Sequence, residues 1–102
     1  MERIFHEKEI EYCNSKIENS RAQSFAGRFA AKEAFVKALG TGFFGEGAIV
    51  PRDIWIENEK NGKPKLCFSD KVTKFLEEKN IRNWDVSLSH HEENAIAFVL
   101  LT

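Results

Sequence analysis

The hydrophobic and polar positions of the chain follow a helical period in its first half. At about 100° per residue, Phe25, Phe29 and Val36 fall on one narrow stripe. This pattern predicts a long helix from about residue 20 to residue 39, with that stripe as its apolar side. The polar stretch before it, residues 7–19, has only scattered apolar positions and predicts a short helix and a loop.

A strand period follows in the second half of the chain. Ile54 and Ile56 share one strand face, and residues 65–68 return as the partner strand. Between them, the pair Asn61-Gly62 is the dipeptide of a type I′ hairpin turn. The middle of the chain therefore predicts a β-hairpin.

The last third predicts one helix and two strands. Ser69 has the position of an N-cap for a helix that ends near Asn80. Residues 86–89 alternate between apolar and polar, and residues 95–101 form a nearly continuous apolar strand. This order of elements predicts an α+β fold with an antiparallel sheet, one long helix and shorter helices.

Length and composition narrow the classes of protein. A chain of 102 residues with 42% hydrophobic content can bury one core, so we expect a single domain over residues 1–102. A net charge of −1 with interspersed signs argues against a nucleic-acid binder. No apolar run reaches ~18 residues, so we expect a cytoplasmic protein without a membrane span. Cys13 and Cys67 are far apart and indicate neither a zinc site nor a redox pair.

A second stripe of the long helix carries candidate chemistry. Glu33 and Lys37 stand one turn apart beside two alanines, and Arg28 and Lys32 flank them from the other side. One carboxylate among three cations suits a hard cation held between the protein and a polyphosphate. Two simpler interpretations stay open. Glu33 and Lys37 can be the i,i+4 ion pair of any exposed helix, and Gly40 can be a left-handed C-cap.

Read as a string, residues 25–42 (FAGRFAAKEAFVKALGTG) closely resemble the holo-acyl-carrier-protein synthase family of 4′-phosphopantetheinyl transferases. The signature of that family is an aromatic-small-x-Lys-Glu-Ala-x-x-Lys helix. Residues 53–56 followed by 61–64 resemble its central hairpin, and residues 86–90 resemble its late strand, which ends in Ser-x-Ser-His. The resemblance runs from residue 3 to residue 101.

One departure from the family concerns the start of the chain. Family members open with a short apolar strand carrying Gly-x-Asp, whose aspartate is the other magnesium carboxylate, and a basic helix that docks the carrier protein. Here residues 1–5 resemble the second segment of the family. Asp53, Asp70 and Asp85 lie in no Gly-x-Asp context. We therefore expect a chain that is short at its N-terminus and lacks this metal ligand.

The resemblance implies a magnesium-dependent enzyme of fatty acid biosynthesis. It would transfer 4′-phosphopantetheine from coenzyme A to a serine of apo-acyl carrier protein and release adenosine 3′,5′-bisphosphate. Glu33 would hold Mg²⁺ and take the proton of the attacking serine, directly or through a water. Lys37 would stabilise charge on the leaving phosphate, and Arg28 and Lys32 would hold the anionic groups of the nucleotide.

Weaker implications concern the loops and the strand end. Gly40 and Gly42 would let backbone approach the ligand closely. His90 would lie against the phosphates of the coenzyme, whereas for His91 a structural or solvent-facing role is the expectation. Residues 43–47 are either a connector with two phenylalanines on the core or a flap near the cofactor.

The resemblance also implies an assembly. Small members of the family form homotrimers with the cofactor between adjacent subunits, so the long helix of one chain would face loops of the next. A second interpretation stays open because of the missing aspartate. The chain would then be a truncated, non-catalytic homologue that binds coenzyme A or carrier protein without turnover.

Overall fold

The computed structural model describes residues 4–16, 18–40, 49–91 and 94–102. Its helices and strands, in chain order, are α1 (Glu7–Asn14), α2 (Glu18–Leu39), the 3-10 turn η1 (Pro51–Asp53), β1 (Ile54–Asn58), β2 (Pro64–Phe68), α3 (Asp70–Glu78), β3 (Trp84–His91) and β4 (Asn94–Leu101). The strands form two antiparallel hairpins, β1 with β2 and β3 with β4. The predicted α+β fold is confirmed.

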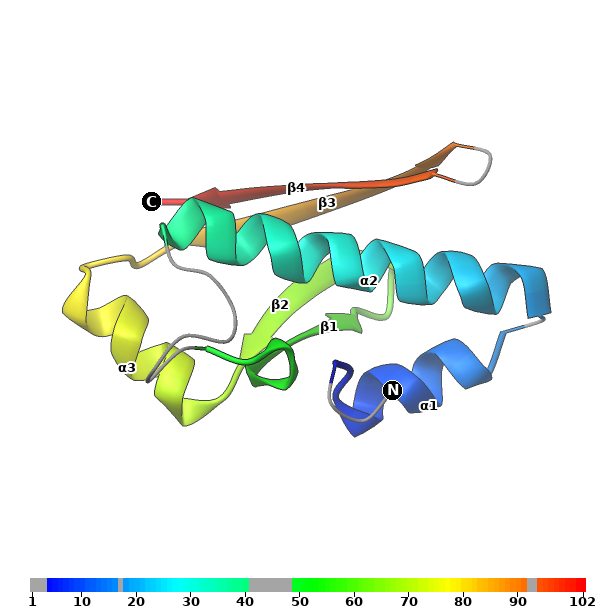
Figure 1. Ribbon diagram of the computed structural model, residues 1–102, viewed down its shortest axis with the longest axis horizontal. Helices are drawn as coiled ribbons and strands as arrows, with labels where there is room; N and C mark the ends of the chain where they lie inside the picture. The colour runs from blue at the N-terminus through cyan, green and yellow to red at the C-terminus, as the bar shows by residue number, and fades with distance from the viewer. Residues whose placement is uncertain (1–3, 17, 41–48, 92–93) are drawn as a thin grey trace.

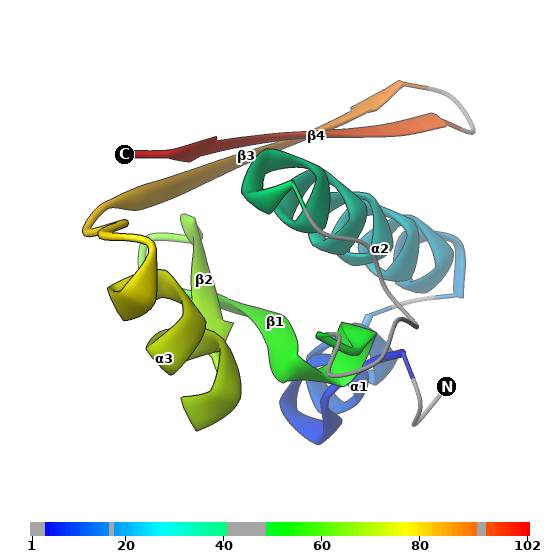
Figure 2. The same cartoon turned by 60° about the vertical axis from the view of Figure 1, so that its left-hand side comes forward.

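The long helix α2 is the centre of the molecule. The β3–β4 hairpin runs along one side of it, and β1, β2 and α1 lie on the other side (Figures 1 and 2). The helix α3 packs beside β2, away from α1. The two sheets do not share hydrogen bonds, and they are linked both through α2 and through direct packing of β2 against β3.

The core lies between α2, the two hairpins and α3. It joins α2 to β1, β2, α3 and β3 through eleven buried side chains, of which the largest from α2 is Phe35. Its buried members are Ala31, Phe35, Val36, Leu39, Ile49, Ile54, Ile56, Leu66, Val72, Leu76 and Val86. A smaller cluster packs α1 against the first half of α2 and consists of Phe5, Cys13 and Phe25. Burial of this apolar surface is the main driving force that holds the elements together.

One predicted core position of α2 is wrong. Phe29 is 38% exposed, whereas Phe35 is fully buried. Both aromatic residues lie on apolar parts of the helix surface, and the hairpins cover the part that carries Phe35. Phe25 and Val36 of the predicted apolar stripe are buried, so only Phe29 lies outside the core.

The β1–β2 turn also differs from the prediction. A type I′ turn needs positive φ at both central residues. Gly62 has φ of 88°, but Asn61 does not have a positive φ. The amide of Gly62 donates to the carbonyl of Glu59 at 2.8 Å, and the amide of Glu59 donates to the carbonyl of Lys63 at 2.8 Å. This is the three-residue connection in which a left-handed glycine follows a tighter turn.

Two helix ends agree with the sequence. Ser69 is the N-cap of α3, with its hydroxyl accepting from the amide of Val72. Gly40, directly after α2, has φ of 81°, so the left-handed C-cap is confirmed. Within the described ranges, none of the helices combines the length and apolar character that a membrane crossing requires.

The predicted last strand is present as β4, with one face open to solvent. Its exposure alternates along the strand, and Ile96, Phe98 and Leu100 are 63%, 69% and 55% exposed. The opposite face packs on α2. An open strand face made of three large apolar side chains is unusual for the surface of a monomer.

Candidate active site

A cavity of about 680 Å3 opens where α1, α2, the β1–β2 turn and β3 meet. Its walls combine apolar side chains, among them Leu88, Phe98 and Leu100, with two cations, an imidazole and the carboxylate of Asp85. The lining residues that matter here are Tyr12, Arg28, Asn58, Lys63, Ser87 and His90. The cavity thus joins segments that are far apart in the sequence.

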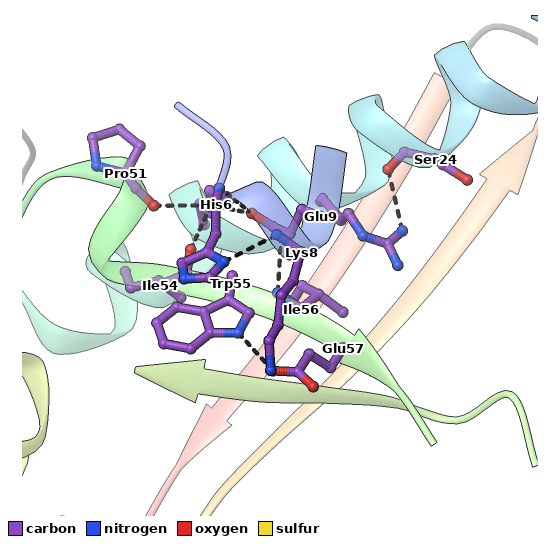
Figure 3. Close-up of polar contacts among 11 residues, drawn as sticks. His6, Lys8, Glu9, Ser24, Pro51, Ile54, Trp55, Ile56 and Glu57 are labelled. Atoms are coloured by element: carbon purple, nitrogen blue, oxygen red, sulfur yellow. Dashed lines mark hydrogen bonds and ion pairs between the residues drawn. The ribbon is translucent and has the colours of Figure 1, made fainter. Parts of the chain in front are cut away.

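Arg28 is the most unusual group in this cavity. Its side chain is only 4% exposed, and its guanidinium lies 4.4 Å from the ring centroid of Tyr12. One terminal nitrogen donates to Oδ1 of Asn58 at 2.5 Å. The other donates to the carbonyl of Ser24 at 3.5 Å, a contact that Figure 3 shows.

No carboxylate pairs with Arg28 among the residues that the structure describes, and its buried Nε has no hydrogen-bond partner there. Burying a guanidinium without a counter-ion is costly. Such a group in a cavity wall favours an anionic ligand, and guanidinium matches the oxygens of phosphate or carboxylate. The structure therefore supports an anion site at Arg28.

His90 reaches the same cavity from β3. It is exposed, and it lies beside Gly27 of α2. An imidazole donates a hydrogen bond to an anionic oxygen in its neutral form and offers two donors when it is protonated. The structure thus brings together two of the predicted ligand-binding residues, Arg28 and His90.

Lys32 does not join Arg28 and His90 in this cavity. Its position contradicts the prediction that it holds the anionic groups of a nucleotide. Its side chain is completely buried, and Nζ forms an ion pair of 2.7 Å with Oε1 of Glu9. Nζ also donates to the carbonyl of Pro51 at 2.9 Å and to the carbonyl of Ile54 (Figure 3). An ammonium has three donors. All three are occupied by protein, so Lys32 has none to offer to a phosphate.

Lys32 instead ties α2 to α1 and to the start of β1. Its partner Glu9 is also fully buried, and Oε2 of Glu9 accepts from the amide of Ile56 at 2.9 Å. Burial lowers the pKa of Lys32, whereas the charge of Glu9 acts in the opposite direction. No local pattern predicts this pair, because Glu9 is one of several glutamates in a polar helix.

Glu33 and Lys37 lie on another side of α2. Glu33 follows Arg28 by five positions, which is a rotation of about 140° around the helix axis. Both Glu33 and Lys37 are exposed. They form no ion pair with each other or with other described residues, so the simple i,i+4 pair is not observed.

Glu33 is therefore free to act as a metal ligand, but it stands alone. No cluster of three or more histidine, cysteine or acidic side chains suitable for a metal occurs in the part of the chain that the structure describes. Mg²⁺ usually takes one or two carboxylates and completes its shell with phosphate oxygens and waters. A single carboxylate at Glu33 fits Mg²⁺ that arrives with a polyphosphate, and it does not fit a dedicated protein cage.

The remaining predicted ligand residues are the two glycines. Gly40 is exposed, and a Cβ placed there would meet no atom within 4 Å. Its positive φ explains the glycine without any ligand. Gly42 and the predicted loop at residues 43–47 lie outside the described residues.

Sequence reasoning missed three residues of the cavity. In the sequence, Tyr12 is only one of the scattered apolar positions of residues 7–19, and no motif marks Asn58. Lys63 lies in the Asn-Gly-Lys-Pro stretch that resembles the family hairpin, and this position was the one available signal. Contacts over 30 residues, such as Arg28 with Asn58, leave no local pattern in a sequence.

An anion cavity beside a long Lys-Glu-Ala-x-x-Lys helix defines a phosphate-handling α+β protein. The model of the 4′-phosphopantetheinyl transferase superfamily matches residues 1–99. The chain belongs to this superfamily.

Individual relatives agree with this assignment. The holo-[acyl-carrier-protein] synthase of Geotalea daltonii is 40% identical over 101 residues, which are 99% of this chain and 78% of that protein. The fold is similar to that of the Helicobacter pylori holo-[acyl-carrier-protein] synthase in complex with coenzyme A, with a TM-score of 0.80, 34% identity, and coverage of 99% of this chain and 79% of that one. The Bacillus anthracis enzyme in complex with CoA (3′,5′-ADP) gives a TM-score of 0.80 at 37% identity, over 99% and 77% of the two chains.

Proposed function

We propose that this protein transfers 4′-phosphopantetheine from coenzyme A to a serine of apo-acyl carrier protein, with Mg²⁺, in the cytoplasm and in support of fatty acid biosynthesis. The observation that carries the proposal is the buried guanidinium of Arg28 without a counter-ion, in a cavity shared with His90. Membership of the superfamily and likeness to holo-[acyl-carrier-protein] synthases supply the reaction class.

Arg28 and His90 hold the anionic groups of the coenzyme in this proposal. Tyr12 and Asn58 fix the plane of the guanidinium, because one packs on its face and the other accepts from its edge. Lys63 adds a second cation at the β1–β2 turn. A phosphate there replaces water as the partner of a charge that the fold has already buried, so little reorganisation is needed on binding.

Glu33 and Lys37 act at the other end of the coenzyme. The hydroxyl oxygen of the carrier serine attacks the phosphorus that bears pantetheine, and the bond from that phosphorus to the bridging oxygen breaks. Adenosine 3′,5′-bisphosphate leaves with the bridging oxygen. Glu33 accepts the serine proton directly or through water, and Lys37 stabilises the charge on the leaving phosphate. Mg²⁺, when bound through Glu33, supplies charge neutralisation on the pyrophosphate.

The two groups of residues suggest an assembled site. Arg28 and Glu33 face sides of α2 that are about 140° apart. One coenzyme that meets both kinds of group is therefore placed more easily between two copies than within one. The exposed apolar face of β4 supports the same idea, because Phe98 and Leu100 also border the cavity. We include a homotrimer with the coenzyme between subunits in the proposal.

The test is an assay of purified protein with coenzyme A, Mg²⁺ and apo-acyl carrier protein, following the mass of the carrier. We expect the mass to increase by one phosphopantetheine, and we expect chelation of Mg²⁺ or Glu33→Gln to stop the increase. Arg28→Ala should raise KM for coenzyme A with a smaller effect on kcat, because the group acts in binding. Binding of coenzyme A with no transfer would show the non-catalytic homologue instead.

A further inference from the structure

Gly27 lies inside α2, immediately before Arg28, and its side of the helix faces β3. A Cβ at this position would lie 3.0 Å from Cε1 and 3.3 Å from Nε2 of His90, and 3.9 Å from Cδ1 of Leu88. Gly27 is not among the described glycines with a positive φ. The helix therefore does not need glycine here for its backbone conformation.

Glycine in the interior of a helix is unfavourable compared with alanine. Gly27 thus weakens α2 without relieving any backbone strain. What the missing side chain does provide is room, and the atoms that occupy this room are those of one imidazole ring. The ring of His90 lines the same cavity as Arg28.

We propose that Gly27 is a positioning residue, whose missing side chain lets the imidazole of His90 rest against α2 at the anion site formed with Arg28. This inference rests on the proposed function, because it takes His90 as a ligand of the coenzyme phosphates. A methyl group at residue 27 displaces the ring from α2. Two consecutive residues of α2 then serve the same site, Arg28 by its charge and Gly27 by its lack of a side chain.

The crowding falls on the end of a side chain and not on backbone. His90 is exposed, so its ring can rotate outward with little cost to the fold. Gly27→Ala should therefore keep the midpoint of thermal unfolding, Tm, or raise it. The same change should weaken binding of the phosphate ligand. If Gly27 had a purely structural role, Gly27→Ala would lower Tm and also weaken binding.

The experiment is calorimetric titration of the full chain with adenosine 3′,5′-bisphosphate. It compares wild type, Gly27→Ala, His90→Ala and the double variant. A hydrogen bond to a charged group is worth roughly tenfold in Kd, so we expect each single variant to lose about that factor. In the double variant, Gly27→Ala should add no further loss, because the ring that it displaces is already absent.

Two controls separate the position of the His90 ring from the stability of α2. Ala22 lies on the exposed side of α2. The change Ala22→Gly is expected to lower Tm while leaving Kd unchanged. The NMR signal of the His90 Cε1 proton, assigned by its loss in His90→Ala, should shift in Gly27→Ala without any ligand present. This signal reports the ring position independently of binding and of turnover.

The outcomes distinguish the inference from the proposed function. If His90→Ala weakens binding and Gly27→Ala does not, the inference is overturned and the role of His90 stands. If His90→Ala has no effect, the proposed role of His90 fails and takes the inference with it. A loss of Tm in Gly27→Ala, or a further loss of affinity in the double variant, also overturns the inference, because the effect then does not pass through the ring.

Discussion

Replacement of Lys32 by methionine tests the buried ion pair between α1 and α2. The change keeps much of the aliphatic stem and removes the ammonium. It leaves the carboxylate of Glu9 buried without its cation, and it leaves the carbonyls of Pro51 and Ile54 without this donor. Breaking one side of a buried pair costs about 3–5 kcal/mol.

A loss of this size is a large part of the stability of a small domain, which is about 5–15 kcal/mol. For a chain of this length, it corresponds to a fall in Tm of at least about 12 °C. The measurement is urea unfolding followed by circular dichroism, with thermal unfolding as a second readout. Adding Glu9→Gln to Lys32→Met should recover part of the loss, because the uncompensated charge is removed as well.

The matched control is Lys37→Met on the same helix. Lys37 is exposed and has no ion pair with the described residues, so the change should alter the free energy of unfolding by no more than about 0.5 kcal/mol. If Lys32→Met matched Lys37→Met in stability, the ammonium would not hold the helices together. The original expectation of a phosphate ligand at Lys32 would then have to be considered again.

Three further results are expected. Phe35→Ala should cost about 3–5 kcal/mol of unfolding free energy, and Phe29→Ala should cost less than half of that, measured by urea unfolding; equal costs would contradict the assignment of the core. Burial, together with the charge of Glu57, raises the pKa of Cys67 to about 11. Because the thiolate is the nucleophile, the rate of alkylation by iodoacetamide, followed by mass, should keep rising with pH beyond the ordinary thiol value of about 8.5, and a plateau near that value would refute the shift. Phe98→Asp should reduce the sedimentation coefficient in analytical ultracentrifugation, because it places a charge in the apolar face of β4, and an unchanged value would argue against that face as a subunit contact.

The parts of the fold that follow from local patterns were predictable. The long helix, the β1–β2 hairpin, the two later strands and the left-handed Gly40 each depend on periodicity or on one residue with a special conformation. The core side of α2 was not predictable to the same degree. Alanines and aromatic residues cover most of its circumference, so several stripes satisfy a helical period, and contacts with β1 and β3 select the one that contains Phe35.

The candidate site was predictable where a residue's role depends on its own motif. Arg28 and His90 were expected at one ligand, and the structure brings them to one cavity. The prediction for Lys32 was wrong because the position of its ammonium depends on Glu9, 23 positions earlier, and on carbonyl groups that no sequence pattern reveals. The same limit explains why Tyr12 and Asn58, which hold Arg28, were not expected in the site.

Placing Arg28 and Glu33 on different sides of α2 also means that two kinds of defective chain can repair each other. In an oligomer whose sites lie between copies, a chain with Arg28→Ala still offers an intact Glu33 to its neighbour, and a chain with Glu33→Gln still offers an intact Arg28. When the two impaired chains are mixed and allowed to exchange, with coenzyme A kept well below the KM of Arg28→Ala, some contacts unite both intact halves. Transfer activity should rise in the mixture, whereas it should stay low when both changes are combined in every chain.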